Sequence, residues 1–522
     1  GAGLSPDLTA GNILDSPWAL TCILLKAFSL LIVFPWLAAG GLAISVWVTK
    51  TIPNFIFNRQ GLRPTKLPSS TWVIHGKKYD LSAWVDDHPG GRHALDLGRN
   101  RDCTGLFESY HVFVDKTKLQ KILARFEIRS EEAAKDSLDN IQAQVGTNQT
   151  GLEFADAFHE DVKQMVRDHF QGSSHKMKPW VAALNLGLVL TEIVLIYLFL
   201  QGSNIAMVLL PTCGWLLTCN VAHDGSHFAV SSRPWVNEVA AMAGMPMCFP
   251  RLCWEIQHVV QHHIYTNDED DVDLYHFLPV CRTARFTKWA TQFRLQWLAI
   301  FFVLPTTVGH LMFVVPIDLL SGQLDAISGL KRYSHCQNLA DLVARSRKSI
   351  AFELALVSIF PMLSIYMFGF VDGFRRVFTA YGIASYWFIF ITQGAHIQEA
   401  CMVGKEGQYT SWAKRQAATS VNFRPDSYFW LLLTGGLNLQ SLHHVVPVIG
   451  SSHLIDLYPK YKEVCARHGV ELKEVRGIFE FFTGFIAWVR ELAQKEEEEP
   501  AEASKEIGAP LVQDQCSVVM DK

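Results

Sequence analysis

The chain lacks the cysteine pattern of a disulfide-stapled protein. Its 11 cysteines are scattered over 522 residues, with no C-x-x-C pair and no compact cluster. Secreted scaffolds rely on such clusters, so a reducing environment on the cytosolic side of a membrane is the simpler interpretation. The chain also lacks an excess of charge. Its net charge of −4 gives no support for nucleic-acid binding by the whole molecule.

Hydrophobic residues, by contrast, are abundant and clustered. They make up 49% of the chain, and the mean hydropathy is +0.14. A soluble enzyme of this size needs fewer, so the composition indicates a membrane protein. The length exceeds that of a single compact core, which predicts two or more domains.

The longest apolar runs define the candidate membrane segments. The first covers residues 17–49, is too long for a signal-peptide core and is followed by no small-residue cleavage site. Four basic residues follow it between positions 50 and 66, so the positive-inside rule places the next segment in the cytosol. We therefore predict a membrane anchor and connector at 1–65. Further apolar runs lie at 180–200, 204–222, 297–320, 350–371 and 377–395.

Residues 66–130 have the texture of a small soluble domain. T-W-V-I and K-K-Y-D-L flank an H-G pair there and predict a β-hairpin. We expect a polar, helical linker at 131–178, a membrane domain at 179–490 and a disordered tail at 491–522. The tail is acidic and poor in apolar residues, as in K-E-E-E-E-P-A-E-A-S-K-E.

Histidines gather at three places, each beside a predicted membrane boundary. V-A-H-D-G-S-H-F has two of them at i and i+4, which share a helix face but also occur by chance in a chain with 20 histidines. Chance is a poor account of three such clusters, and so many imidazoles exceed the four ligands of one structural zinc. We therefore predict two metal ions. The clusters supply seven histidines and a glutamine: His223, His227, His258, His262, His263, Gln440, His443 and His444.

The clusters can meet only if they lie on one side of the membrane. The runs at 180–222 leave that side and return to it. Three runs separate the second cluster from the third, and an odd number of crossings would keep them apart. We assign 297–320, which contains two prolines and a histidine, to an interfacial helix. Four spans remain, and His396 at the end of the last one is either a further ligand or a boundary histidine.

The motifs H-D-G-S-H, H-V-V-Q-H-H and Q-S-L-H-H together resemble the histidine boxes of the membrane fatty acid desaturase superfamily. Gln440, where many members have histidine, resembles the front-end desaturases in particular. The resemblance covers roughly residues 180–470. It implies an all-α membrane domain with a non-haem di-iron centre on the cytosolic face. It further implies O2 activation, hydrogen abstraction from an acyl chain in a narrow tunnel, catalytic roles for the eight box residues, and metal ligation by them and by His396.

Carboxylates near the boxes could orient the histidines. A metal-bound imidazole usually donates its other N–H to a carboxylate or a carbonyl oxygen. Asp270, Asp271 or Asp273 after the second box, and Asp224 within the first, are candidates for this role. A solvated acidic loop is the alternative.

Two further histidines lie 23 residues apart in the small domain. D-D-H-P-G-G contains His88, and C-T-G-L-F-E-S-Y-H ends at His111. Two imidazoles on opposite faces of a haem give a six-coordinate iron, which favours electron transfer over O2 binding. With Trp72, Tyr79 and Phe107 at suitable spacings, the segment resembles the small α+β domain of cytochrome b5. This implies haem b with His88 and His111 as axial ligands.

Other polar residues of the small domain are interpreted as surface groups. His75 and His93 belong to this set. An acidic rim could dock a basic reductase or could simply be solvated; it would consist of Asp86, Asp87, Asp96, Asp102 and Glu108.

The two domains together predict a front-end acyl desaturase that places a cis double bond in a polyunsaturated chain. The fused haem would supply the two electrons that each O2 requires, at high effective concentration. The expected partners are an acyl-CoA or phospholipid substrate, O2, NADH-cytochrome b5 reductase and the lipid bilayer. The expected location is the endoplasmic reticulum, with both sites facing the cytosol. The alternatives are a fatty acid or sphingolipid hydroxylase with the same di-iron centre, and a non-catalytic membrane haem protein that carries electrons.

Overall fold

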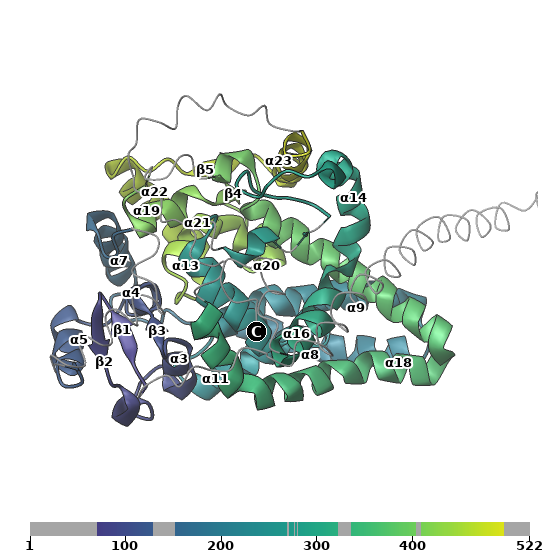
Figure 1. Cartoon of the computed structure of the whole chain (residues 1–522), viewed down its shortest axis with the longest axis horizontal. Coiled ribbons are helices and arrows are strands. Elements are labelled where there is room, and N and C mark those ends of the chain that lie inside the picture. Colours follow the sequence, from purple (N-terminus) through teal and green to yellow (C-terminus); the bar gives the residue numbers. More distant parts are fainter. Residues whose placement is uncertain are drawn as a thin grey trace, which may run out of the picture.

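The computed structural model describes residues 70–128, 152–268, 271–275, 277–278, 280–321, 336–402 and 409–494. The anchor predicted at 1–65 lies outside these ranges, as does nearly all of the tail predicted at 491–522. Figure 1 shows a small mixed α/β unit beside a larger helical body.

The small unit is built on a three-stranded sheet. Strand β1 (Trp72–Ile74) pairs antiparallel with β2 (Lys77–Tyr79) and parallel with β3 (Arg101–Asp102). The predicted hairpin is confirmed. His75 and Gly76 form its turn with φ of 50° and 72°, the left-handed conformation that a two-residue hairpin turn requires. Three helices complete the unit: α3 (Gly91–Leu97), α4 (Thr104–Tyr110) and α5 (Lys116–Leu123).

Apolar helices form the centre of the larger body. Among the residues that the structure describes, four segments are long and apolar enough to cross a membrane: Pro179–Leu200, Asn204–Ser226, Thr291–Ser321 and Asp341–Ala395. Helices α8 (Pro179–Leu200) and α9 (Asn204–Leu217) provide the first two. On α8, Leu190 and Ile193 are each 59% exposed, which marks a surface suited to lipid.

Helix α18 (Cys336–Thr392) is two helical arms joined at Gly369, whose φ is 77° and ψ is 169°. The arms fold back on each other, since the ring centroids of Phe360 and Tyr381 are 6.3 Å apart. The two arms lie so close beside the turn that a Cβ on Gly373 would be 2.6 Å from the Ile365 backbone. The two arms contain the runs at 350–371 and 377–395 that the sequence predicts to cross.

Segment 291–321 is an interrupted helix. It contains α14 (Gln296–Val303), α15 (Thr307–Gly309) and α16 (Val315–Ser321), separated by a 3-10 turn at Pro305 and a π turn at His310–Val314. Proline removes a helical hydrogen bond, which accounts for the first break. The segment is long and apolar enough to span. The second and third histidine boxes can meet only if the chain between them crosses the membrane an even number of times. The two arms of α18 already provide two crossings. The assignment of 297–320 to an interfacial helix therefore stays a prediction.

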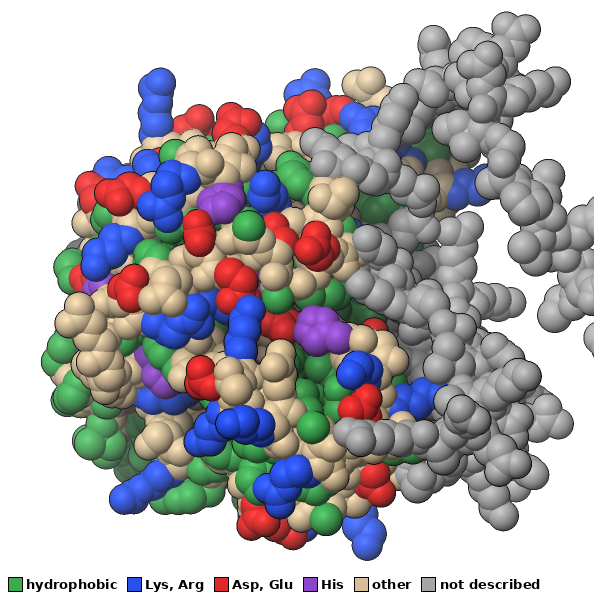
Figure 2. Space-filling view, turned by 90° about the vertical axis from the view of Figure 1, so that its left-hand side faces the viewer, with side chains coloured by type: hydrophobic (Ala, Val, Ile, Leu, Met, Phe, Trp, Pro, Cys, Tyr) green, Lys and Arg blue, Asp and Glu red, His purple; other side chains and the backbone are tan. Residues whose placement is uncertain are grey.

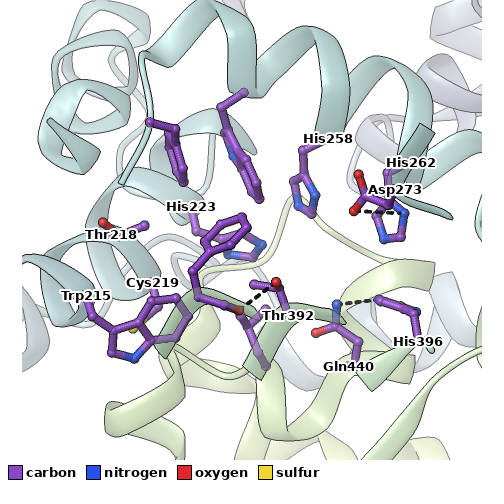
Figure 3. A pocket seen from close by; sticks show the side chains of 14 residues that line it. Trp215, Thr218, Cys219, His223, His258, His262, Asp273, Thr392, His396 and Gln440 are labelled. Carbon is purple, nitrogen blue, oxygen red and sulfur yellow. Dashed lines mark hydrogen bonds and ion pairs between the residues drawn. The ribbon is translucent and has the colours of Figure 1, made fainter. Parts of the chain in front are cut away.

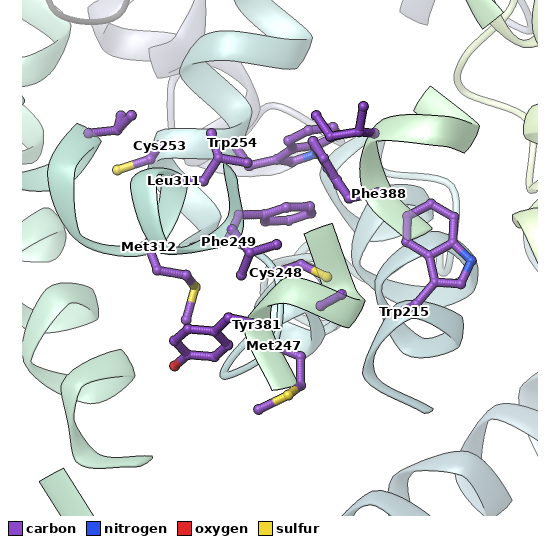
Figure 4. Close-up of a cluster of buried hydrophobic side chains, with 14 of the residues drawn as sticks. Trp215, Met247, Cys248, Phe249, Cys253, Trp254, Leu311, Met312, Tyr381 and Phe388 are labelled. Atoms are coloured by element: carbon purple, nitrogen blue, oxygen red, sulfur yellow. The ribbon is translucent and has the colours of Figure 1, made fainter. Parts of the chain in front are cut away.

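The buried core continues from the membrane helices to the second histidine box (Figure 4). Phe249 stacks on Trp254 with ring centroids 4.2 Å apart, and Trp254 stacks on His258 at 4.1 Å. Met312, from the π turn of segment 291–321, is fully buried in the same cluster. An apolar environment therefore adjoins the histidines directly.

Shorter helices form the part of the larger body away from α8 and α18, among them α19 (Trp412–Ala418), α21 (Gln440–Val445) and α22 (Leu454–Arg467) (Figure 1). Within the described residues of this larger body, strands β4 (Val421–Phe423) and β5 (Lys473–Val475) form a parallel pair, so the domain is not purely helical. Helix α7 (Ala157–Phe170), in the predicted linker, packs against α22 and buries Phe158 and Val162. The described part of the linker is therefore a packed element. The remaining helices are α10 (His223–Ser226), α11 (Pro234–Ala241), α12 (Arg251–Trp254), α13 (His263–Tyr265), α20 (Tyr428–Thr434) and α23 (Ile478–Glu491).

Candidate metal and haem sites

Five histidines from three distant segments converge on one point. Their ligand atoms all lie within 4.8 Å of one another, and all five are buried. The first two come from α10 and its C-terminal cap, at the end of the apolar stretch Asn204–Ser226. The fifth comes from α21, and its ring centroid is 4.5 Å from that of His223. The five-histidine cluster comprises His223, His227, His258, His263 and His443.

A π-helical turn at Glu255–His262 decides how the second box is divided. In a π turn the backbone hydrogen bonds join residues five apart, so side chains at i and i+5 approach each other. His258 and His263 have this spacing, and their Nε2 atoms lie 3.1 Å apart. His262 instead contributes to a second group of ligands.

The second group contains three histidines and a glutamine. Ligand atoms of His262, His396 and His444 lie within 4.8 Å of one another. The Gln440 amide nitrogen is 2.9 Å from Nε2 of His396 (Figure 3). The same nitrogen is 3.0 Å from Nε2 of His444. Amide oxygen and nitrogen positions are interchangeable in shape, so turning the amide over would direct its oxygen at the same point. We call this group of four residues the glutamine-containing cluster.

Two side chains and a backbone carbonyl hold the outer nitrogens of the three histidines in the glutamine-containing cluster. The Nδ1 atom of His262 is 3.0 and 3.1 Å from the two carboxylate oxygens of Asp271, and 3.5 Å from Asp273. Nδ1 of His396 is 2.9 Å from the carbonyl oxygen of Thr419, and Nδ1 of His444 is 2.9 Å from Oε1 of Gln416. Each imidazole thus keeps Nε2 for a metal ion, as is usual when the other ring nitrogen of a metal-bound histidine has a hydrogen-bond partner.

The carboxylates that were predicted to orient the histidines do not all lie beside a histidine. Asp271 and Asp273 face His262 as expected. Asp270 lies outside the described residues. The prediction for Asp224 is wrong, because its carboxylate accepts hydrogen bonds from the backbone N–H and the hydroxyl of Ser451, both at 3.0 Å. Asp224 instead holds the loop at Ser451 against the first histidine box.

Unsatisfied buried atoms indicate that the two clusters fit metal ions. Buried polar atoms almost always have a hydrogen-bond partner. Among the described residues, both ring nitrogens of His223, Nε2 of His227 and Nε2 of His443 are buried with none, and so is Oε1 of Gln440. Imidazole nitrogens with one amide oxygen form a donor set suited to iron, copper or zinc.

The protonation states of most of the cluster histidines also favour metal binding. Burial and neighbouring histidines hold the pKa of His258, His263 and His444 well below the ordinary value, so these imidazoles are neutral and able to bind a metal. Burial also disfavours charge on His262, but the carboxylates of Asp271 and Asp273 outweigh it and raise its pKa to about 9. At neutral pH this ring therefore holds a proton on both nitrogens: Asp271 faces the proton on Nδ1, and a metal ion would have to displace the proton on Nε2.

A narrow cavity of about 20 Å³ adjoins both clusters (Figure 3). Aromatic side chains, Trp215, Phe249 and Phe388 among them, line it together with Thr392 and several of the histidines. The space admits one small molecule such as water or O2. Apolar walls around buried nitrogen ligands suit chemistry on a hydrocarbon.

The small unit contains a second pair of facing imidazoles. The ring centroids of His88 and His111 are 6.1 Å apart. Two imidazoles on one metal at about 2.0–2.1 Å from each nitrogen have centroids about 6 Å apart, so the spacing fits an iron between them. Nδ1 of His88 is 3.4 Å from the Gly91 carbonyl oxygen and Nδ1 of His111 is 2.8 Å from that of Phe107, which leaves each Nε2 for the metal.

The glycines of H-P-G-G have separate roles. A Cβ on Gly90 would lie 2.9 Å from the His88 ring, so the small residue leaves room for that imidazole. Gly91 has φ of 88°, and a Cβ there would lie 2.6 Å from Pro234 of α11. The second glycine therefore permits both the turn and the close approach of the larger body.

Polar contacts join the small unit to the histidine centre. The Tyr110 hydroxyl is 2.7 Å from Nδ1 of His227. Nε2 of His93 is 2.7 Å from the buried carboxylate of Glu255. The surface assignment of His93 is therefore wrong, because its side chain is only 16% exposed and lies in the interface.

The predicted acidic rim is also incomplete. Glu108 is buried and pairs with Lys163 of α7 and with His75, so it cannot meet a partner protein. Asp96 lies 3.7 Å from Arg345 of α18. Figure 2, which faces α5 and α7, shows acidic and basic side chains interspersed instead of a rim of one sign. Of the predicted set, Asp86 and Asp87 are exposed, and Asp102 is partly exposed and accepts a hydrogen bond from Thr104.

Three residues that contact the cluster histidines belong to no sequence motif that predicts this role. Gln416 and Thr419 lie far along the chain from the histidines that they orient, in and after α19. Tyr110 could have been noticed only because it directly precedes His111. Their role depends on packing between distant segments.

Fold and sites together define a helical membrane protein with a cytochrome-type unit and a buried polyhistidine centre. The model of the fatty acid desaturase family matches residues 176–476, and that of the cytochrome b5-like haem/steroid-binding domain matches residues 60–130. The chain belongs to the fatty acid desaturase family and carries a cytochrome b5-like domain on its N-terminal side.

Relatives support this assignment over nearly their whole length. The acyl-lipid omega-13 desaturase of Chlamydomonas reinhardtii is 32% identical over 80% of this chain and 92% of its own. The acyl-lipid (8-3)-desaturase of Physcomitrium patens is 26% identical over 77% and 84%, and human fatty acid desaturase 3 is 26% identical over 84% and 93%. No solved structure matches the chain significantly.

Proposed function

We propose that this desaturase inserts a cis double bond into a polyunsaturated acyl chain, between an existing double bond and the carboxyl end. The observation that carries the proposal is the pair of adjacent ligand groups, five histidines in one and three histidines with Gln440 in the other. The names of two relatives as acyl-lipid desaturases favour an acyl chain carried on a membrane lipid.

The ligand groups would each hold one iron ion. The five-histidine cluster would bind the first, and His262, His396, His444 and Gln440 the second. When bound, the two irons activate O2 and remove hydrogen from the acyl chain. The overall reaction consumes one O2, two electrons and two protons, and yields the alkene and two molecules of water.

The protein residues position and shield this chemistry. Asp271, Thr419 and Gln416 fix the imidazole tautomers of the glutamine-containing cluster. Trp254 stacks on His258 and limits the motion of that ring. The aromatic walls of the cavity would shield the ligand groups from bulk solvent, and this small space would have to widen before an acyl chain could enter it.

The haem unit would deliver the electrons. His88 and His111 would hold haem b through their Nε2 atoms, and NADH-cytochrome b5 reductase would reduce it. This arrangement requires both sites on the cytosolic side of one membrane, which we propose to be the endoplasmic reticulum.

Expression in yeast tests the proposal. Cells fed candidate polyunsaturated acids should accumulate acids that lack two hydrogens, first in phospholipids or in the acyl-CoA pool according to the carrier. His262→Ala and His443→Ala should abolish the product and deplete iron while the haem spectrum stays intact, because the haem ligands are separate. A product with one added oxygen atom would identify a hydroxylase. Unchanged product from His262→Ala would refute the di-iron assignment.

A further inference from the structure

The outer partner of His227 comes from the other domain. The partners of His262, His396 and His444 described above all belong to the helical body. His227 differs, because its Nδ1 faces the hydroxyl of Tyr110 at 2.7 Å. Tyr110 is the last residue of α4 in the cytochrome b5-like unit and directly precedes His111.

The Tyr110 ring is held in place on both sides. It lies nearly parallel to the His227 ring, at an interplanar angle of 16°, and meets Phe228 edge-on at 5.7 Å. Nε2 of His227 is buried without a partner among the described residues. Nδ1 is thus occupied by the tyrosine, and Nε2 is the atom left for a metal ion.

Close packing brings α4 to this position. A Cβ on Gly105 would lie 2.8 Å from the end of the Ile264 side chain, which follows the second box, so α4 packs closely against this segment. The buried contact between His93 and Glu255 fixes the same unit at a second point. Tyr110 is therefore aligned by the docked unit as a whole.

We propose that the docked haem unit completes the metal centre, with Tyr110 as the positioning residue that orients His227. With iron held at Nε2, Nδ1 would keep its proton and donate a hydrogen bond to the tyrosine oxygen. Docking of the cytochrome b5-like unit, with or without its haem, is then coupled to iron retention, and one hydrogen bond joins the neighbour of a haem ligand to an iron ligand. The inference rests on the proposed iron ligation by His227.

The full-length variant Tyr110→Phe tests this role. It keeps the stacked ring and removes the oxygen. We expect an unchanged haem spectrum and about a 10- to 100-fold weaker hold on one non-haem iron, measured as iron per haem during titration with a chelator. Tyr79→Phe is the matched control, since it makes the same change in the core of the same unit, away from His227.

A second variant separates this role from electron delivery. His88→Ala should lose the haem but keep its non-haem iron, and free cytochrome b5 should restore its activity. Free cytochrome b5 should not restore Tyr110→Phe. Full restoration of Tyr110→Phe, or wild-type chelator resistance in that variant, would overturn the inference. If either of these results is found while His262→Ala still loses iron, the role of Tyr110 is refuted but the proposed di-iron function is not.

Discussion

The carboxylate of Asp271 offers the sharpest test of the glutamine-containing cluster. It lies 3.0 and 3.1 Å from Nδ1 of His262 and is fully buried. Asp271→Asn removes the charge but keeps an oxygen, which can still accept the backbone N–H of Asn267 at 2.8 Å. The loop should therefore keep this bond while the backbone N–H of Asp273, 3.0 Å from the other Asp271 oxygen, loses its acceptor and His262 loses its charged partner.

Two independent estimates of the metal-binding free energy lost in Asp271→Asn agree. A hydrogen bond to a charged group contributes about 1.5–3 kcal/mol. Loss of an outer partner of a metal-bound histidine typically lowers metal affinity by about 10- to 100-fold, or about 1.4–2.7 kcal/mol. Asp271→Asn should thus release one of two irons at about 10- to 100-fold lower chelator concentration than the wild type.

Haem provides the internal standard for this assay. Non-haem iron per haem is measured across a chelator titration of the purified, detergent-solubilised protein. Asp268→Asn is the control, because Asp268 lies in the same loop but pairs with Arg415 at 2.6 Å. If Asp271→Asn retains haem and holds both irons as tightly as the Asp268→Asn control, the orienting role of the carboxylate is refuted.

Three further outcomes are expected. His88→Ala should abolish the low-spin b-type spectrum of the full chain, and a retained spectrum would remove the cytochrome assignment. Gln440→His replaces an amide oxygen with a stronger nitrogen donor, so activity should change while iron is kept, as iron analysis and product profiles would show. Burial disfavours charge on His93, but Glu255 outweighs it and raises its pKa, so this contact stabilises docking fully below the ordinary pKa of about 6.5 and weakens as pH rises through the raised value. The melting temperature difference between wild type and Glu255→Gln should therefore shrink from pH 6 to pH 9, and a difference that grows would contradict this pairing.

Local signals in the sequence predicted local features well. The H-G pair at 75–76 predicted a hairpin because the turn needs two residues with positive φ, and this depends on those two positions alone. The histidine boxes likewise stand out as short motifs, and the structure brings their buried side chains together. The bend at Gly369 lies near the end of the apolar run at 350–371, just before the second run that was visible in the sequence.

Partners from distant segments could not be predicted in the same way. Asp224 lies inside a histidine box, yet its carboxylate binds Ser451, more than 200 residues away. Glu108 has the sequence context of a surface acid, but α7 covers it and supplies Lys163. A charged residue shows its partner only when the packing of separate elements is known.

The division of the second box depends on the same kind of information. H-V-V-Q-H-H fits an ordinary α-helix, in which His258 and His262 would share a face and one metal ion. The π turn instead joins His258 to His263 and frees His262 for Asp271 and the other cluster. The six residues by themselves are compatible with both conformations, and the structure shows which one they adopt. The sequence therefore identifies which residues could bind metal, while the fold determines which ion each of them would hold.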